Sequence, residues 1–189
     1  MTNQKLHAKI SEYVAVLQRF VDRIWYPPLL GLLAALDNFI IVIPNDGLLI
    51  SSAMLRPKRW LSLAIWVAIG STIGAFLLSI LIEVHGMPWV LNLLPGLAES
   101  SAWIWTEKFF DSYGLIVVFL IAATPLPQQP GVILATISHV PLSHIVLVVF
   151  CGRIIKFLAM AYISTHAPRL ITRMWGIRGE LKEVGIKVE

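Results

Sequence analysis

Long apolar runs, interrupted at a few polar positions, dominate the pattern of the chain. From Trp60 to Ile82 there are 23 residues without a charged side chain, and from Ser112 to Gly152 there are 41 without Asp, Glu, Lys or Arg. A helix that rises about 1.5 Å per residue needs about 20 residues to cross a hydrocarbon core of about 30 Å. The pattern therefore predicts an all-α integral membrane protein with spanning helices over 60–82 and 142–163.

The apolar stretch 29–55 is predicted to form a re-entrant helical hairpin. A Pro-Asn-Asp-Gly run at 44–47 interrupts it. Proline removes a backbone donor, and the other three residue types favour turns. The arms 29–43 and 47–55 would be about 22 Å and 13 Å long as helices, which is too short to span the bilayer. The chain should therefore enter the membrane and return on the same side.

The second half of the chain repeats this design. A Thr-Pro-Leu-Pro-Gln-Gln-Pro-Gly run at 124–131 breaks its apolar stretch. Gly47 and Gly131 are 84 residues apart, and so are Pro57 and Pro141. Two matching offsets predict an internal repeat. We expect the halves to be related by inverted topology, with their breaks meeting near the midplane, as in secondary transporters.

The chain is predicted to consist of segments that lie on the membrane, enter it or stay outside it. Apolar side chains recur at spacings of three and four before Trp25, which predicts a helix lying on the membrane surface. The segments are a cytoplasmic amphipathic surface helix (1–26), a first repeat (27–83), an external interfacial segment with a short amphipathic helix (84–111), a second repeat (112–163) and a basic cytoplasmic tail (164–189).

Charge and composition add an orientation and exclude several function classes. The chain is 57% hydrophobic and 14% charged, with a net charge of +4. Basic residues concentrate near both termini and at 56–59, whereas acidic residues prevail over 83–111. The positive-inside rule predicts cytoplasmic termini in a multi-pass protein of the bacterial inner membrane. No basic patch on a soluble fold suggests a nucleic-acid partner, and the lone Cys151 cannot form an intrachain disulfide.

Four charged residues fall within the predicted membrane segments: Asp37, Asp46, Arg153 and Lys156. Charges at bilayer depth cost about 2.5–3.5 kcal/mol each on insertion scales, so they indicate partners or a function. Asp37 in the first hairpin arm and Arg153, roughly 15 Å deep in the last span, lie at depths that allow a pair. That pair could be a structural salt bridge or part of a site, and Lys156 could instead extend to the surface.

The polar residues at the two breaks have both structural and functional readings. Asp46, beside Asn45, could cap the helix that begins near Gly47, or it could exchange protons from a partly dry site. Gln128 and Gln129 provide neutral donors at the second break. The sequence therefore predicts a substrate or proton site made of Asp37, Asn45, Asp46, Gln128, Gln129, Arg153 and Lys156, with helix breaks at Pro44, Gly47, Pro125, Pro127 and Gly131.

Sequence signatures of an enzyme, a cofactor or a metal are missing. His139 and His144 are five residues apart with a proline between them, so they do not form a helical metal pair. Ser138 lacks the glycine elbow or adjacent base that activates a nucleophile. We therefore expect no catalytic residue, no cofactor and no metal ion.

Several short motifs, in order, resemble the DedA/VTT superfamily of SNARE-associated membrane proteins, and within it the YqaA-like branch. The similarity covers residues 27–163 and is carried by Asp37-Asn38, Pro44-Asn45-Asp46, Arg56-Pro57-Lys58-Arg59-Trp60, Gly70-Ser71-x-x-Gly74, Thr124-Pro125-Leu126-Pro127 and Gly152-Arg153-Ile154-Ile155-Lys156-Phe157. Many DedA proteins place arginines around the second break, where this chain has Thr124, Gln129 and Pro130. Arg153 and Lys156 would then supply the cations.

The resemblance implies two facing re-entrant hairpins and the movement of phospholipids or polyprenyl phosphates between leaflets, with proton coupling in some bacterial members. Acidic residues in the first hairpin correspond by position to Asp37 and Asp46. The expected partners are membrane lipids and protons, and a homo-oligomer is compatible with the sequence. A proton-coupled carrier of small solutes and a non-transporting scaffold or quality-control protein are the alternative functions.

Overall fold

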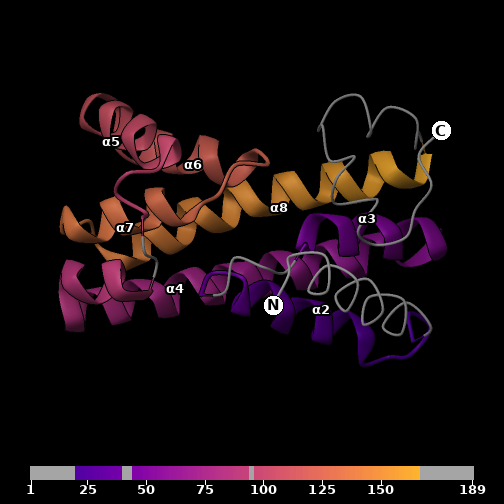
Figure 1. Cartoon of the computed structure of the whole chain (residues 1–189). Helices are drawn as coiled ribbons and strands as arrows, with labels where there is room; N and C mark the ends of the chain where they lie inside the picture. The colour runs from indigo at the N-terminus through magenta and orange to yellow at the C-terminus, as the bar shows by residue number, and fades with distance from the viewer. Residues whose placement is uncertain (1–19, 40–43, 94–95, 167–189) are drawn as a thin grey trace, which may run out of the picture.

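A computed structural model describes residues 20–39, 44–93 and 96–166, and this part of the chain is helical with no strand. The elements shown in Figure 1 are α2 (Tyr26–Leu36), α3 (Asn45–Leu55), the short 3-10 helix η1 (Pro57–Arg59), α4 (Trp60–Leu93), α5 (Ser101–Tyr113), α6 (Leu115–Ala123), α7 (Gln129–Ile137) and α8 (Leu142–His166). Most of the predicted surface helix 1–26 and of the predicted tail 164–189 lies outside the described residues.

Two of these helices, α4 and α8, are long and apolar enough to cross a membrane. They pack against each other along the centre of the bundle and run in opposite directions (Figure 1). The predicted spans 60–82 and 142–163 lie within them. The remaining helices of the two broken segments have 9 to 11 residues each, so they reach only about half the thickness of the hydrocarbon core.

The first span is longer than predicted, because α4 continues to Leu93 where an interfacial loop was expected from residue 84. Gly86 has a positive φ of 72° and a ψ of −174°, so the helix is kinked there. Only glycine adopts this conformation readily, and Pro88 then stands in the first turn of the continuing helix, where it costs no hydrogen bond. The predicted short helix of this segment is α5, capped by the Ser100 hydroxyl.

The four helices of the two broken segments, α2, α3, α6 and α7, pack on the long helices α4 and α8. In the first half α2 lies along α4, and in the second half α6 lies along α8. The second arm of each hairpin crosses to the other half, because α3 contacts α8 and α7 contacts α4. Each long helix therefore carries one arm from its own half and one arm from the other half.

Small residues bring the short helices into close contact with the long ones. A Cβ atom at Gly70 of α4 would lie 1.8 Å from the carbonyl oxygen of Gly31 in α2. In the second half, a Cβ atom at Gly152 of α8 would lie 2.7 Å from the Cβ of Ala122 in α6. The Gly70-x-x-x-Gly74 motif of α4 therefore serves close helix packing.

Replacing Gly70 by alanine should destabilise the protein by forcing α2 and α4 apart. Overpacking of this kind costs about 1–3 kcal/mol or more, which exceeds the gain in helix propensity. Gly131→Ala is the matched control, since its new Cβ would meet a side-chain methyl group of Ile121 at 3.4 Å. Thermal unfolding in detergent should show a lower Tm for Gly70→Ala than for Gly131→Ala. Equal Tm values would contradict this account of the contact.

Candidate functional site

A salt bridge buried inside the bundle joins α3 to α8. The Nζ atom of Lys156 lies 2.7 Å from Oδ2 of Asp46, and the two side chains are 4% and 13% exposed. Lys156 therefore does not extend to the surface, and that reading is wrong. Asp46 is not a helix cap either, because α3 begins at Asn45 with Pro44 as its N-cap. Its carboxylate lies in the first turn, where the helix dipole favours negative charge.

Arg153 lies one turn before Lys156 on α8, and spacing of three residues places both cations on the same face. Its side chain is buried at 7% exposure. Its Nε donates a hydrogen bond to Oε1 of Gln128 at 2.6 Å, and the guanidinium stands over the Phe157 ring at 5.5 Å from the centroid. The predicted salt bridge with Asp37 is not formed among the described residues, although the two charges are close enough to act on each other.

Gln128 connects both hairpins to both long helices. Its Nε2 donates to Oδ1 of Asn38, just beyond α2, and to the hydroxyl of Ser71 in α4 at 3.3 Å. The Asn38 amide nitrogen in turn donates to the Ser71 carbonyl at 3.3 Å. With Arg153 as the donor to its Oε1, all parts of the Gln128 amide are engaged across three separate elements. This is the point where the two helix breaks meet.

Asp37 and Gln129 make a second contact between the breaks. Asp37 is the C-cap of α2, so it stands at the break and not within the first arm as predicted. Its backbone carbonyl accepts a hydrogen bond of 3.3 Å from Nε2 of Gln129, and its carboxylate is hydrogen-bonded to the Asn45 side chain. Oε1 of Gln129 is buried and has no hydrogen-bond partner among the described residues. A buried acceptor without a donor is costly and marks a place for a ligand or water.

The polar residues that meet around the two breaks are called the polar cluster. They are Asp37, Asn38, Asn45, Asp46, Ser71, Gln128, Gln129, Arg153 and Lys156. Seven of its members were predicted as site residues, and the structure brings all seven together. Asn38 and Ser71 were not predicted as site residues. Each is a buried polar residue within or beside an apolar run, which is the signal that could have identified it.

The predicted break residues differ in whether they lie within the breaks. Pro125 and Pro127 lie between α6 and α7, as predicted, and both are exposed. Gly47 and Gly131, by contrast, lie in the first turns of α3 and α7, so they are helical and not part of the breaks. Pro44 directly precedes α3, and residues 40–43 of the first break are outside the described part of the chain.

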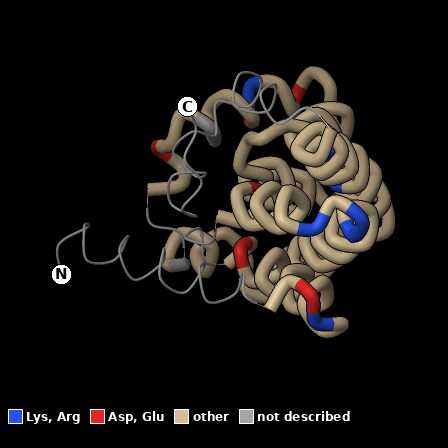
Figure 2. The backbone as a smooth tube through the Cα atoms, turned by 90° about the vertical axis from the view of Figure 1, so that its right-hand side faces the viewer, with Lys and Arg blue, Asp and Glu red and all other residues tan. Residues whose placement is uncertain are grey.

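The charges of the polar cluster balance, with two carboxylates against two cations. Figure 2 shows that Lys, Arg, Asp and Glu occupy only short stretches of the backbone, while most of the helical bundle carries neither. A buried charge is tolerable only with compensation nearby, so the balance explains why four charged groups can persist inside an apolar bundle.

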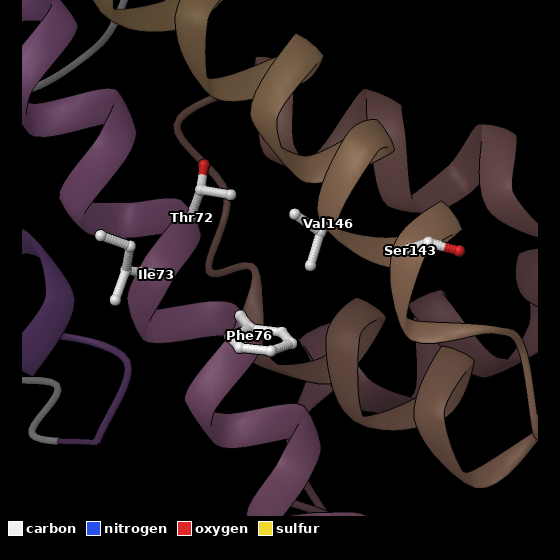
Figure 3. A pocket seen from close by; sticks show the side chains of 5 residues that line it. All are labelled: Thr72, Ile73, Phe76, Ser143 and Val146. Atoms are coloured by element: carbon white, nitrogen blue, oxygen red, sulfur yellow. The ribbon is translucent and has the colours of Figure 1, made fainter.

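An apolar groove lies beside the polar cluster, between α4 and α8. Its volume is about 370 Å³, and its accessible lining is apolar; it is formed by Thr72, Ile73, Phe76, Ser143 and Val146 (Figure 3). Thr72 follows Ser71, which belongs to the polar cluster, and its hydroxyl donates to the Ala68 carbonyl and not into the groove. Ile73 and Phe76 are 49% and 38% exposed, so the groove belongs to the outer, apolar face of the bundle.

Comparisons with known proteins find similarity to an uncharacterised protein. A protein of Haemophilus influenzae described as "Uncharacterized protein" is 25% identical over 135 residues, which cover 71% of this chain and 70% of that protein. No family model matches the chain, and no solved structure matches it.

A double-mutant cycle on Asp46→Asn and Lys156→Met should measure a coupling energy of about 1–3 kcal/mol, because the pair is in direct contact and buried. The matched control is the exposed pair of Asp22 and Arg56, whose side chains are 55% and 52% exposed. Its coupling should be about 1 kcal/mol or less. Unfolding free energies from denaturant titration in detergent provide both values. A coupling of the buried pair no larger than that of the exposed pair would show that burial does not strengthen the contact.

Proposed function

We propose that the protein moves lipids between membrane leaflets, as a flippase or scramblase. The headgroup of a phospholipid or polyprenyl phosphate would pass along the polar cluster, while the acyl or prenyl chains stay in the bilayer. The observation that carries this proposal is the balanced set of buried charges where two helix breaks meet, between two helices long enough to span a membrane. Broken helices with polar groups at midplane depth are the usual architecture of transporter sites.

We also propose that the two halves form an inverted repeat of two re-entrant hairpins, an architecture that would suit this function. α3 begins at Asn45 and α7 at Gln129, which are 84 residues apart, the same offset that relates Gly47 to Gly131. The exchange of arms between the halves is the packing expected for two facing hairpins. We propose on this basis, and on the motifs it contains, that the chain is a member of the DedA/VTT superfamily and of its YqaA-like branch.

Lipid is favoured over a small solute by the apolar groove next to the polar cluster. A groove of about 370 Å³ on the outer face of two spanning helices is within the usual size range of ligand sites and open to lipid chains. A purely structural scaffold would be expected to satisfy its buried polar atoms. The unpartnered Oε1 of Gln129, within the part of the chain that the structure describes, favours a transport role instead.

Protons are the proposed coupling ions, and the inner membrane of a bacterium is the proposed location. Asp46 has a direct cationic partner, whereas the Asp37 carboxylate makes no salt bridge among the described residues. Asp37 is therefore the better of the two candidates for reversible protonation. Both termini and the 56–59 loop would face the cytoplasm, by the positive-inside rule.

Purified protein reconstituted into vesicles with tail-labelled fluorescent lipids should accelerate their movement between leaflets. Arg153→Gln should lower this rate about tenfold or more, because it leaves two carboxylates against one cation and removes a charged donor. Arg153→Lys, which keeps the charge, should retain more activity, and the exposed Arg56→Gln should leave the rate unchanged. Rates at the protein-free background for phospholipids and a polyprenyl phosphate, with and without a pH gradient, would refute lipid transport.

The orientation can be tested with single cysteines in a Cys151→Ser background. Lys58 and Glu99 are both exposed, and they are predicted to lie on opposite sides of the membrane. A membrane-impermeant maleimide should label Glu99→Cys in spheroplasts with intact inner membranes, and Lys58→Cys only after permeabilisation. The reverse pattern would mean that the chain is inserted the other way.

A further inference from the structure

The four charges of the polar cluster are compensated in two different ways. Asp46 and Lys156 form a direct salt bridge, so each charge is neutralised by its neighbour. Arg153 forms no salt bridge among the described residues, although the charges of Asp46 and Asp37 both act on it, and Asp37 likewise has no salt bridge there. One carboxylate and one guanidinium are thus held apart inside the bundle.

The Arg153 side of this arrangement is suited to an anion. A guanidinium has five N–H donors in a rigid plane. Among the described residues, the hydrogen bond of this group runs from Nε to Gln128, which leaves the four terminal N–H donors for another acceptor. A phosphate or carboxylate group matches these paired donors, and the burial of Arg153 would make the interaction strong.

The Asp37 side is suited to an ammonium group. Asp37 provides a carboxylate, and Gln129, whose amide nitrogen binds the Asp37 carbonyl, provides a buried oxygen without a donor. An ammonium group has three donors and no acceptor. It could therefore satisfy the carboxylate and the vacant amide oxygen together, which an anion could not.

We propose that the polar cluster binds a zwitterion, with its anionic group at Arg153 and its ammonium group at Asp37 and Gln129. This inference rests on the proposed function and specifies its substrate as a lipid headgroup that carries both a phosphate and an amine. A phosphate lipid without an amine would engage Arg153 but would leave the Asp37 carboxylate and the Gln129 oxygen without an ammonium group. Of the lipids named under the proposed function, phospholipids with an amine should therefore move faster than polyprenyl phosphates. A free zwitterion such as an amino acid has the same chemistry without the lipid chain.

The test compares tail-labelled phosphatidylethanolamine with phosphatidylglycerol of identical chains in the same vesicles. The first lipid should move about tenfold faster or more, since the ammonium adds charged hydrogen bonds. Asp37→Asn should reduce movement of phosphatidylethanolamine about tenfold and leave phosphatidylglycerol unchanged or faster. Asp37→Glu should restore the preference. Glu83→Gln, which removes an exposed carboxylate of α4 away from the polar cluster, should leave both rates unchanged.

The possible outcomes separate the inference from the proposed function. Equal rates for the two lipids, or an equal loss of both in Asp37→Asn, would overturn zwitterion binding while lipid transport stands. If neither lipid moves, lipid transport fails, and thermal-shift titration decides the inference with glycerophosphoethanolamine, glycerophosphoglycerol and glycine. Stabilisation by glycerophosphoethanolamine or glycine that is lost in Asp37→Asn supports zwitterion binding, and stabilisation by neither of these two zwitterions overturns it.

Discussion

The structure depends on how a broken helix satisfies its polar groups where water is scarce. Each break frees donors and acceptors that an apolar environment cannot satisfy, so irregular backbone persists only against other protein groups or a wet cavity. Here the two breaks satisfy each other through Gln128, Asn38 and the Asp37 carbonyl. The close approach of α2 and α4 belongs to the same arrangement. A Cβ atom at Gly74 would lie 2.4 Å from the Asn38 amide nitrogen, so the missing side chain makes room for the Asn38 hydrogen bonds.

The electrostatics of the polar cluster follow from this meeting of the breaks. α8 is continuous and presents Arg153 and Lys156 on one face, whereas their acidic partners come from the ends of short helices. Lys156 forms a direct salt bridge with Asp46, and the helix dipole at the first turn of α3 also stabilises the Asp46 carboxylate. Arg153 is instead held by a neutral amide, which fixes its position without neutralising its charge. The proposed transport function would need such a difference, because a fully neutralised set of charges has little left to offer a substrate.

The main elements of the fold could be predicted from the sequence because the length and polarity of an apolar run limit the helices that it can form. The apolar runs predicted two spanning helices, and the proline-containing runs predicted the breaks near 44 and 124–128. The ends of the helices were harder to predict. The chain regains helical geometry after a single non-helical residue at Gly86, and α2 ends at Leu36 before any proline. Neither event has a local signal as strong as a proline.

The sequence by itself determined which residues could form a site, because a charge or an amide in an apolar run must have a partner or a function. It could not determine the partners. Asp37 was paired with Arg153 on grounds of depth alone, yet the buried salt bridge joins Asp46 to Lys156, and Arg153 binds Gln128. The depth of a residue along a helix does not determine which way its side chain faces around the helix axis. It also does not determine which long helix each hairpin arm packs against. The facing of each side chain and the pairing of arms with long helices are set by the packing of small residues and by the exchange of arms between the halves. Both exist only in the tertiary structure.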